Sequence, residues 1–176
     1  MNIAAWIHDV NIVLEQLKKK DLGYPHSPNV VLPPGDKDLL HQLLAEAKLN
    51  EDPQIGAFYE LCDGISCPDI WNGYFIHTTK LALRSLRTWP VEISGPIACK
   101  ILVFGSDGGG GLFAMQMDGP GKILYLPVDG VTGDAVFDGS LNPVKFISHD
   151  FFGFLDRVLA DFRAFIDDRP AWIYMV

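Results

Sequence analysis

The chain has 176 residues, of which 48% are hydrophobic and 20% charged, and 22 acidic residues outnumber 14 basic ones for a net charge of −8. This length and composition are typical of one globular domain and exclude a disordered chain. The acidity excludes a nucleic-acid-binding protein, because phosphate binding needs clustered lysine and arginine. We therefore expect a single domain over residues 1–176 without a nucleic-acid partner.

The first part of the chain has the pattern of helices joined by a proline-rich connector. Over residues 2–20 apolar side chains recur at spacings of three and four, which predicts an amphipathic helix: Ile3, Ile7, Val10, Leu14 and Leu17. Residues 21–35 hold four prolines, which exclude a helix and predict an extended connector. Asp36 is the expected N-cap of a second helix, and a third is expected from Pro53 to Cys62, ended by Gly64.

Beyond residue 70 the composition changes to that of strands. Aromatic and β-branched residues predict four strands, over residues 73–78, 97–105, 112–117 and 122–128. The sequence Asp-Gly-Pro-Gly at 118–121 predicts a hairpin turn between the last two of them. Residues 129–143 are rich in glycine and aspartate, which indicates a long loop with at most one short strand.

A last helix is expected after these strands. Ser148 is its predicted N-cap, its apolar face reaches Ile166, and Arg169-Pro170 ends it. The apolar tail of residues 171–176 is expected to pack on the domain or on a partner. Helices, then consecutive strands, then a helix favour the α+β class, with a central, mostly antiparallel sheet flanked by N-terminal and C-terminal helices.

The cysteines and the N-terminus predict the compartment. The chain has three cysteines, whereas a secreted disulfide scaffold normally has an even number. The first residues lack the order of charged and apolar residues of a signal peptide, and no run reaches the roughly 18 apolar residues of a membrane helix. We therefore expect a cytoplasmic protein that does not bind membranes.

Residues 104–111, Phe-Gly-Ser-Asp-Gly-Gly-Gly-Gly, are the most distinctive segment. Gly109, Gly111 and Ala114 match the spacing of a dinucleotide-binding loop, but that motif needs a following helix, and the turn at 118–121 leaves no room for one. The segment also lacks the Lys-Ser/Thr ending of a P-loop and the glycine two residues before Ser106 that a nucleophile elbow needs. A wide turn between antiparallel strands is therefore the favoured interpretation.

No cofactor, metal or catalytic residue is expected. Cys62, Cys67 and His77 are close in sequence, but structural zinc sites usually have two closely spaced ligand pairs. The histidines are scattered, so the sequence names no nucleophile and base at a recognisable spacing. The aspartates after residue 128 do not have the spacing of a calcium-binding loop.

Acidic residues gather in one part of the chain. Between residues 101 and 138 there is a single basic residue, Lys122, and five aspartates: Asp107, Asp118, Asp129, Asp134 and Asp138. All five lie in predicted turns or loops, so they form an acidic surface for a basic partner if these turns gather on one side of the sheet. Alternatively, aspartate occurs there because it is a good turn former. The sequence leaves both interpretations open.

Four segments match the pattern of one known family. They are Phe58-Tyr-Glu-Leu-Cys-Asp-Gly-Ile65, Gly73-Tyr-Phe-Ile76, the glycine hairpin Ile101–Ala114, and the helix from Ser148 with Phe151, Phe154 and Leu155. Together they resemble the SUKH superfamily of Smi/Knr-like domains, and the glycine hairpin is the most specific match. The resemblance covers about residues 50–166. The first 50 residues, a helical N-terminal extension, match less well, although Leu32-Pro33 is similar to a Leu-Pro pair in the family's pattern.

The resemblance implies an α+β domain with a non-enzymatic role. Most bacterial members resemble immunity proteins, which bind and neutralise a cognate toxin of a polymorphic or contact-dependent system, and the eukaryotic relatives are regulatory interaction modules. The family has no shared catalytic residues. The resemblance also implies that the glycines of these motifs serve the fold: Gly64, Gly105, Gly108 and Gly109.

The expected function is therefore to bind a cognate protein toxin. A basic nuclease is the toxin that an acidic protein suits best, because complementary charge speeds their encounter. The expected contacts, with Trp71 as the aromatic anchor, are Asp107, Asp129, Asp134, Asp138 and Trp71. A general regulatory protein-interaction module is the alternative, and a nucleotide-binding enzyme is less favoured. The sequence decides neither the identity of the partner nor whether the protein is a monomer or a homodimer.

Overall fold

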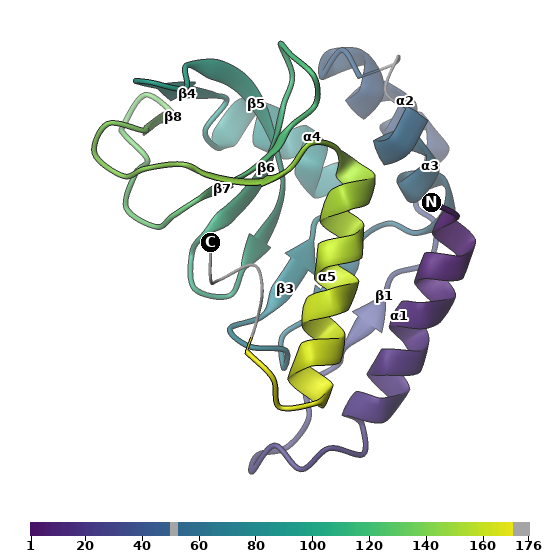
Figure 1. Ribbon diagram of the computed structural model, residues 1–176. Helices are drawn as coiled ribbons and strands as arrows, with labels where there is room; N and C mark the ends of the chain where they lie inside the picture. Colours follow the sequence, from purple (N-terminus) through teal and green to yellow (C-terminus); the bar gives the residue numbers. More distant parts are fainter. Residues whose placement is uncertain (50–52, 171–176) are drawn as a thin grey trace.

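The computed structural model describes residues 1–49 and 53–170, which form five helices and nine strands. Their order is α1 (Ile3–Leu17), β1 (Val30–Val31), α2 (Lys37–Glu46), α3 (Pro53–Leu61), β2 (Ile65–Cys67), β3 (Tyr74–Ile76), α4 (Thr79–Thr88), β4 (Glu92–Ser94), β5 (Cys99–Asp107), β6 (Leu112–Gln116), β7 (Ile123–Leu126), β8 (Val136–Asp138), β9 (Lys145–Ser148) and α5 (Phe151–Ile166). Helices at both ends of this order flank the sheet (Figure 1). The predicted α+β class is therefore confirmed.

The strands form one sheet with β5 at its centre. Seven strands follow one another in the order β1-β2-β3-β5-β6-β7-β9, and β4 joins this path by pairing with β5 and with β8. All pairs of these strands are antiparallel except β4 with β8, which run parallel. The mostly antiparallel sheet follows from the short turns between consecutive strands, which cannot accommodate a parallel crossover.

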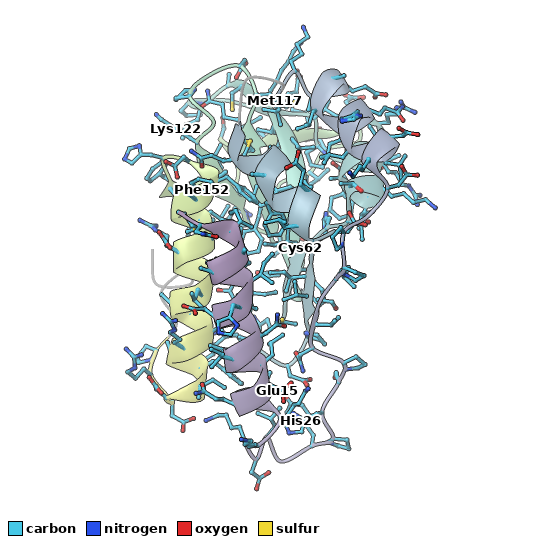
Figure 2. All side chains as sticks on the ribbon, turned by 90° about the vertical axis from the view of Figure 1, so that its right-hand side faces the viewer. Glu15, His26, Cys62, Met117, Lys122 and Phe152 are labelled. Atoms are coloured by element: carbon cyan, nitrogen blue, oxygen red, sulfur yellow. The ribbon has the colours of Figure 1, made fainter. Side chains whose placement is uncertain are left out.

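One face of the sheet carries the main hydrophobic core. Alternate residues of a strand point to opposite faces, so in β5 Leu102 belongs to this core and Ile101 to a second, smaller one. The helices α1 and α5 lie side by side over the main core (Figure 1, Figure 2). The Trp6 Nε1 of α1 donates a hydrogen bond to the Leu155 carbonyl of α5 at 2.9 Å, which links the two helices.

The opposite face carries the second core. Its buried residues come from β4 to β8: Ile93, Cys99, Ile101, Val103, Ala114, Leu124, Leu126 and Phe137. The strands β4 and β8 and the loops beside them cover this part of the sheet and lie on the side of the molecule away from α1 (Figure 1). The candidate site described below is built on this side.

The first 49 residues are an integral part of the domain. The helix α1 packs on α5, α2 packs on α4, and β1 pairs with β2. The connector near β1 is held by Asp69, whose Oδ2 accepts hydrogen bonds from Ser27 N at 2.7 Å and Asn29 Nδ2 at 2.6 Å. Desolvation raises the pKa of Asp69, but the hydrogen bonds from Asn29 and Ser27 outweigh it and hold the pKa below its ordinary value.

Several local predictions are confirmed. Asp36 caps α2, with its Oδ1 accepting a hydrogen bond from Asp38 N at 2.8 Å. The helix α3 ends at Leu61, one residue before the predicted end. Each of the four predicted strands is present, and β6 and β7 pair as an antiparallel hairpin around residues 118–121. These features depend on capping, periodicity and turn chemistry, which are local interactions.

The structure differs from the prediction in three respects. The last helix is capped by Asp150 and not by Ser148, because Asp150 Oδ1 accepts a hydrogen bond from Gly153 N at 2.7 Å and Ser148 ends β9. The region 79–96, to which the sequence assigns no element, contains α4 and β4. Three further short strands, β1, β2 and β9, form only because a neighbouring strand pairs with them.

The described part of the chain has no membrane-spanning helix. The helix α5 has 16 residues, and none of the helices is long and apolar enough to cross a membrane. The apolar tail of residues 171–176, which we expect to pack on the domain or a partner, lies outside the described residues.

Candidate protein-binding surface

The glycine turn between β5 and β6 closes around the carboxylate of Asp107. This residue is 5% exposed, and its Oδ1 accepts hydrogen bonds from the amides of Gly109 at 2.9 Å and Gly111 at 2.7 Å. Its Oδ2 accepts a hydrogen bond from the Tyr125 hydroxyl at 2.7 Å. Burial, together with this hydrogen bond to Asp107, raises the pKa of Tyr125 well above its ordinary value. Backbone amides in a turn can bind phosphate, but here the protein's own carboxylate occupies two of them.

Three of the four glycines predicted to be structural are required by close backbone approach. A Cβ at Gly64, Gly105 or Gly108 would lie 2.3, 2.6 or 1.6 Å from a backbone oxygen of β3 or of the loop before it. Gly64 also has a φ of +103°, which favours glycine. At Gly109 the nearest atom would be 3.4 Å away, an ordinary contact. Packing therefore does not require glycine at position 109, although Gly109 belongs to the motif.

The five residues predicted to contact a partner do not lie together in the structure. Asp107 is buried in its own turn, so the prediction that it contacts a partner does not fit its position. Trp71 is half-buried, and its ring packs edge-on against Phe165 of α5, with centroids 5.1 Å apart, next to the main core. It therefore contributes to packing under α5. Of the other three acids, Asp129 and Asp134 lie in the loop before β8, whereas Asp138 is the half-buried last residue of β8, and its Oδ1 accepts a hydrogen bond from Ser140 N at 2.9 Å.

The two interpretations of the acidic residues apply to different residues. Asp63 Oδ1 accepts hydrogen bonds from the amide and the hydroxyl of Thr79 at 2.7 and 2.8 Å, where α4 begins. Asp118 Oδ2 accepts a hydrogen bond from Lys100 N at 3.1 Å. These acids, like Asp107, hold turns in place. Asp129 and Asp134 are exposed, so they are available as a binding surface.

Exposed apolar side chains accompany these acids. In the described part of the chain, ten large hydrophobic residues are exposed, and four of them lie between residues 128 and 146: Val128 at 49%, Val131 at 51%, Leu141 at 77% and Phe146 at 39%. We call residues 128–146 the loop surface. Its only basic residue is Lys145, at its far end. A surface that combines exposed apolar side chains with an excess of charge of one sign is typical of a protein interaction site.

A shallow groove of about 330 Å³ borders the loop surface. It lies between the end of α4 and residues 131–135, and its apolar walls are formed by Trp89, Pro90, Leu112, Val131 and Ala135. We call it the Trp89 groove. The sequence prediction missed it because no helix was assigned before Trp89. The available signal was Trp89-Pro90, since proline commonly follows the end of a helix.

The structure brings together one nucleophile and base that are far apart in sequence. His77 Nε2, at the end of β3, lies 3.2 Å from Ser106 Oγ in β5. The His77 ring is 6% exposed and packs edge-on against Trp89, with centroids 5.0 Å apart. Within the described residues, Nδ1 has no hydrogen-bond partner, so no carboxylate orients the ring. Desolvation lowers the pKa of His77 to about 4, which makes it a weak base.

The burial of neutral His77 makes stability depend on pH. Its pKa rises from about 4 in the native state to about 6.5 on unfolding, so unfolding takes up a proton below pH 6.5. The wild type is therefore expected to lose about 2–3 kcal/mol relative to a His77→Gln variant between pH 7.5 and 4.5. Urea unfolding at several pH values measures this difference. Ser106→Ala is expected to keep the wild-type pH dependence, because burial and not the serine lowers the pKa. Parallel curves for wild type and His77→Gln would contradict this account.

A larger groove, of about 530 Å³, lies between α2, α4 and the β6–β7 turn. Two of its acidic side chains are engaged within the chain: Glu46 pairs with Arg87 at 2.8 Å, and Asp118 accepts the hydrogen bond from Lys100 N. Among residues 1–49 and 53–170, no three histidine, cysteine or acidic side chains gather as they would around a metal ion. Burial raises the pKa of Cys62 and Cys67 to about 12, so these thiols are unreactive at neutral pH.

Comparison with known proteins adds no relative. No protein-family model matches the chain, and no curated protein matches it. The family expectation therefore continues to depend on the four sequence segments quoted above.

Proposed function

We propose that this protein is a non-enzymatic binding protein that neutralises a basic protein partner, in the manner of a SUKH-type immunity protein and its toxin. The observation that carries the proposal is the loop surface, in which Asp129, Asp134, Val131 and Leu141 are all exposed. The apolar side chains supply area to bury in a complex, and the acids supply charge complementarity. The resemblance of four segments to that superfamily supports the same role.

The charge of the loop surface favours a basic partner. Between Lys122 and Lys145 the chain has three aspartates and no lysine or arginine. A surface charge of one sign raises the rate of encounter with a partner of the opposite sign and repels partners of the same sign. A basic nuclease fits this surface, because an acidic protein that covers its phosphate-binding cleft also blocks its substrate.

Two features disfavour the nucleotide-binding alternative. The amides of Gly109 and Gly111 already donate to Asp107, so they are not available to a phosphate. The pair of His77 and Ser106 has a weak base that no third group orients. Both features support a binding role over catalysis at these positions.

The protein encoded by the adjacent gene is the first partner to test. It is expressed alone and together with this chain, and growth is measured along with binding of the purified pair. The proposal expects toxicity that co-expression removes, and a complex at micromolar concentration or below. A harmless neighbour that still binds would support the alternative of a general regulatory module. No toxicity and no binding would contradict the proposal.

Removing charge from the loop surface is expected to weaken this complex. The test variant combines Asp129→Asn with Asp134→Lys. Asparagine is chosen at position 129 because φ there is +73°, a backbone conformation that asparagine tolerates. The dissociation constant is expected to rise about 10- to 100-fold at low salt, mainly through a slower association rate. Kinetics by surface plasmon resonance at low and high salt measure this effect, which should shrink as salt screens the charges.

A matched control changes the same amount of charge elsewhere. Glu60→Gln with Asp156→Lys alters exposed positions on α3 and α5, which cover the other face of the sheet. This control is expected to change affinity by less than about threefold, since distant charges are largely screened. Equal losses in both variants would mean that only net charge matters and that the loop surface is not the contact.

A further inference from the structure

We infer that the Trp89 groove is the anchor pocket of the loop surface and that it receives the side chain of an arginine or lysine of the partner. This inference rests on the proposed function and names the chemistry of one contact. The groove holds about 330 Å³, which exceeds the space that one long side chain needs. Its lining is mostly apolar, with Thr88 and Thr132 as the polar side chains, and the residues on both sides of Asp134 belong to it.

One wall of the groove is held rigidly. Trp89 follows the last turn of α4, and its amide donates to the Ser85 carbonyl at 3.2 Å. Its ring packs against the buried His77 ring, and Ser85 Oγ donates to the Val103 carbonyl of β5 at 2.7 Å. Pro90 restricts the backbone directly after it. The indole is therefore positioned before a partner arrives, which lowers the entropic cost of binding.

The other wall is a short turn bound to β4. Val91 N donates to the Ala135 carbonyl at 3.0 Å, and Ala135 N donates to the Thr132 carbonyl at 3.2 Å. Thr132 N donates to the Val136 carbonyl at 2.8 Å. Because these bonds join residues 132–136 to each other and to the segment after Trp89, both walls belong to one framework. The groove is thus preformed in the free protein.

The charge beside the groove favours a cation. Asp134 stands between Gly133 and Ala135, which both line the groove, and Asp129 is two residues before Val131. The last turns of α4 carry two exposed bases, Arg84 and Arg87, of which Arg87 is paired with Glu46 at 2.8 Å. A long basic side chain can place its methylene groups on the apolar walls and its charge on the indole face or near Asp134. An acidic side chain would be repelled by Asp134, which lies between two lining residues.

The test uses the complete chain and three small probes. Acetyl-arginine amide, acetyl-norleucine amide and acetyl-glutamate amide are titrated while the backbone amide signals of Val131 and Ala135 are followed by NMR. The arginine probe is expected to shift both signals in a saturable way, with a dissociation constant on the order of millimolar. The norleucine probe is expected to bind at least threefold more weakly, and the glutamate probe to cause no saturable shift.

Variants assign the contact to the groove. Trp89→Ala is expected to abolish the response to the arginine probe, and Trp89→Phe, which retains an aromatic wall, to weaken it about twofold. Asp134→Asn is expected to weaken it two- to fivefold, the usual range of an exposed ion pair. Trp71→Phe, the matched tryptophan control, is expected to leave it unchanged. Arg84→Ala is expected to leave it unchanged or strengthen it, whereas a loss there would indicate an anion site and overturn the inference.

The inference and the proposed function can fail separately. If the arginine probe does not shift Val131 and Ala135 while the adjacent-gene product binds in a way that depends on Asp134, the groove inference is wrong and the proposed function stands. If the probe binds as expected and no neighbouring protein binds, the groove inference stands and the proposed function is wrong.

Discussion

Replacing Gly108 with alanine is expected to destabilise the protein by about 3 kcal/mol or more, a loss large enough to unfold a marginally stable domain. A Cβ at this position would lie 1.6 Å from the carbonyl oxygen of Asn72, in the loop before β3. The contact is between two backbones, so no side chain can rotate to relieve it. Urea unfolding followed by circular dichroism measures the loss.

Gly109 offers a control one residue away in the same turn. A Cβ there would meet its nearest atom, Asp107 Oδ1, at 3.4 Å, which is an ordinary contact. Gly109→Ala is therefore expected to change stability by less than about 1 kcal/mol. Similar losses for both variants would mean that the whole run needs glycine for flexibility, and the account based on close approach would be wrong.

Replacing Asp107 with alanine is expected to destabilise the protein by about 3–5 kcal/mol, because three charge-assisted hydrogen bonds would be lost and the Gly111 amide would stay buried without an acceptor. The amides of Gly109 and Gly111 and the hydroxyl of Tyr125 all donate to this carboxylate. Without it, the buried amide of Gly111 would have no acceptor, and the part-buried donors of Gly109 and Tyr125 would lose a charged one. Thermal and urea unfolding measure the loss.

Two further variants separate the contributions of the carboxylate. Asp107→Asn keeps an oxygen that can accept from the two amides, so it is expected to cost about half as much as Asp107→Ala. Tyr125→Phe removes one donor and leaves the turn intact, with an expected cost of about 1 kcal/mol. If Asp107→Ala costs no more than Tyr125→Phe, the carboxylate does not hold the turn. If Asp107→Asn lost partner binding without losing stability, the prediction that Asp107 contacts the partner would be supported after all.

These variants bear on function as well as on the fold. If Asp107 holds the glycine turn, then the most distinctive segment of the sequence is structural, and the proposed recognition falls to the exposed loop before β8. That division is common among binding domains, in which a rigid framework positions exposed loops. The loop surface and the Trp89 groove are then the parts of the molecule to vary in a search for partners.

Local chemistry made much of the fold predictable. The helix α1 follows from apolar residues spaced by three and four, and α2 from the side chain of Asp36 at its N-cap. The hairpin of β6 and β7 follows from Asp-Gly-Pro-Gly at residues 118–121. By contrast, α4 is a polar helix, and its place in the core depends on contacts with α2 and β5 that lie far away in sequence. Short edge strands such as β1 exist only through their pairing.

The acidic residues show that sequence neighbours alone do not determine which side chains are buried. Asp107 and Asp129 are both followed by glycine, and both belong to turns. The composition alone was sufficient to predict an acidic protein, and turn chemistry placed both residues at the ends of strands. Only the tertiary structure distinguishes them, because the Tyr125 hydroxyl and the amides of the glycine turn enclose Asp107, while Asp129 remains exposed. Likewise, Trp89 becomes the wall of a groove only because residues 131–135 fold back beside it.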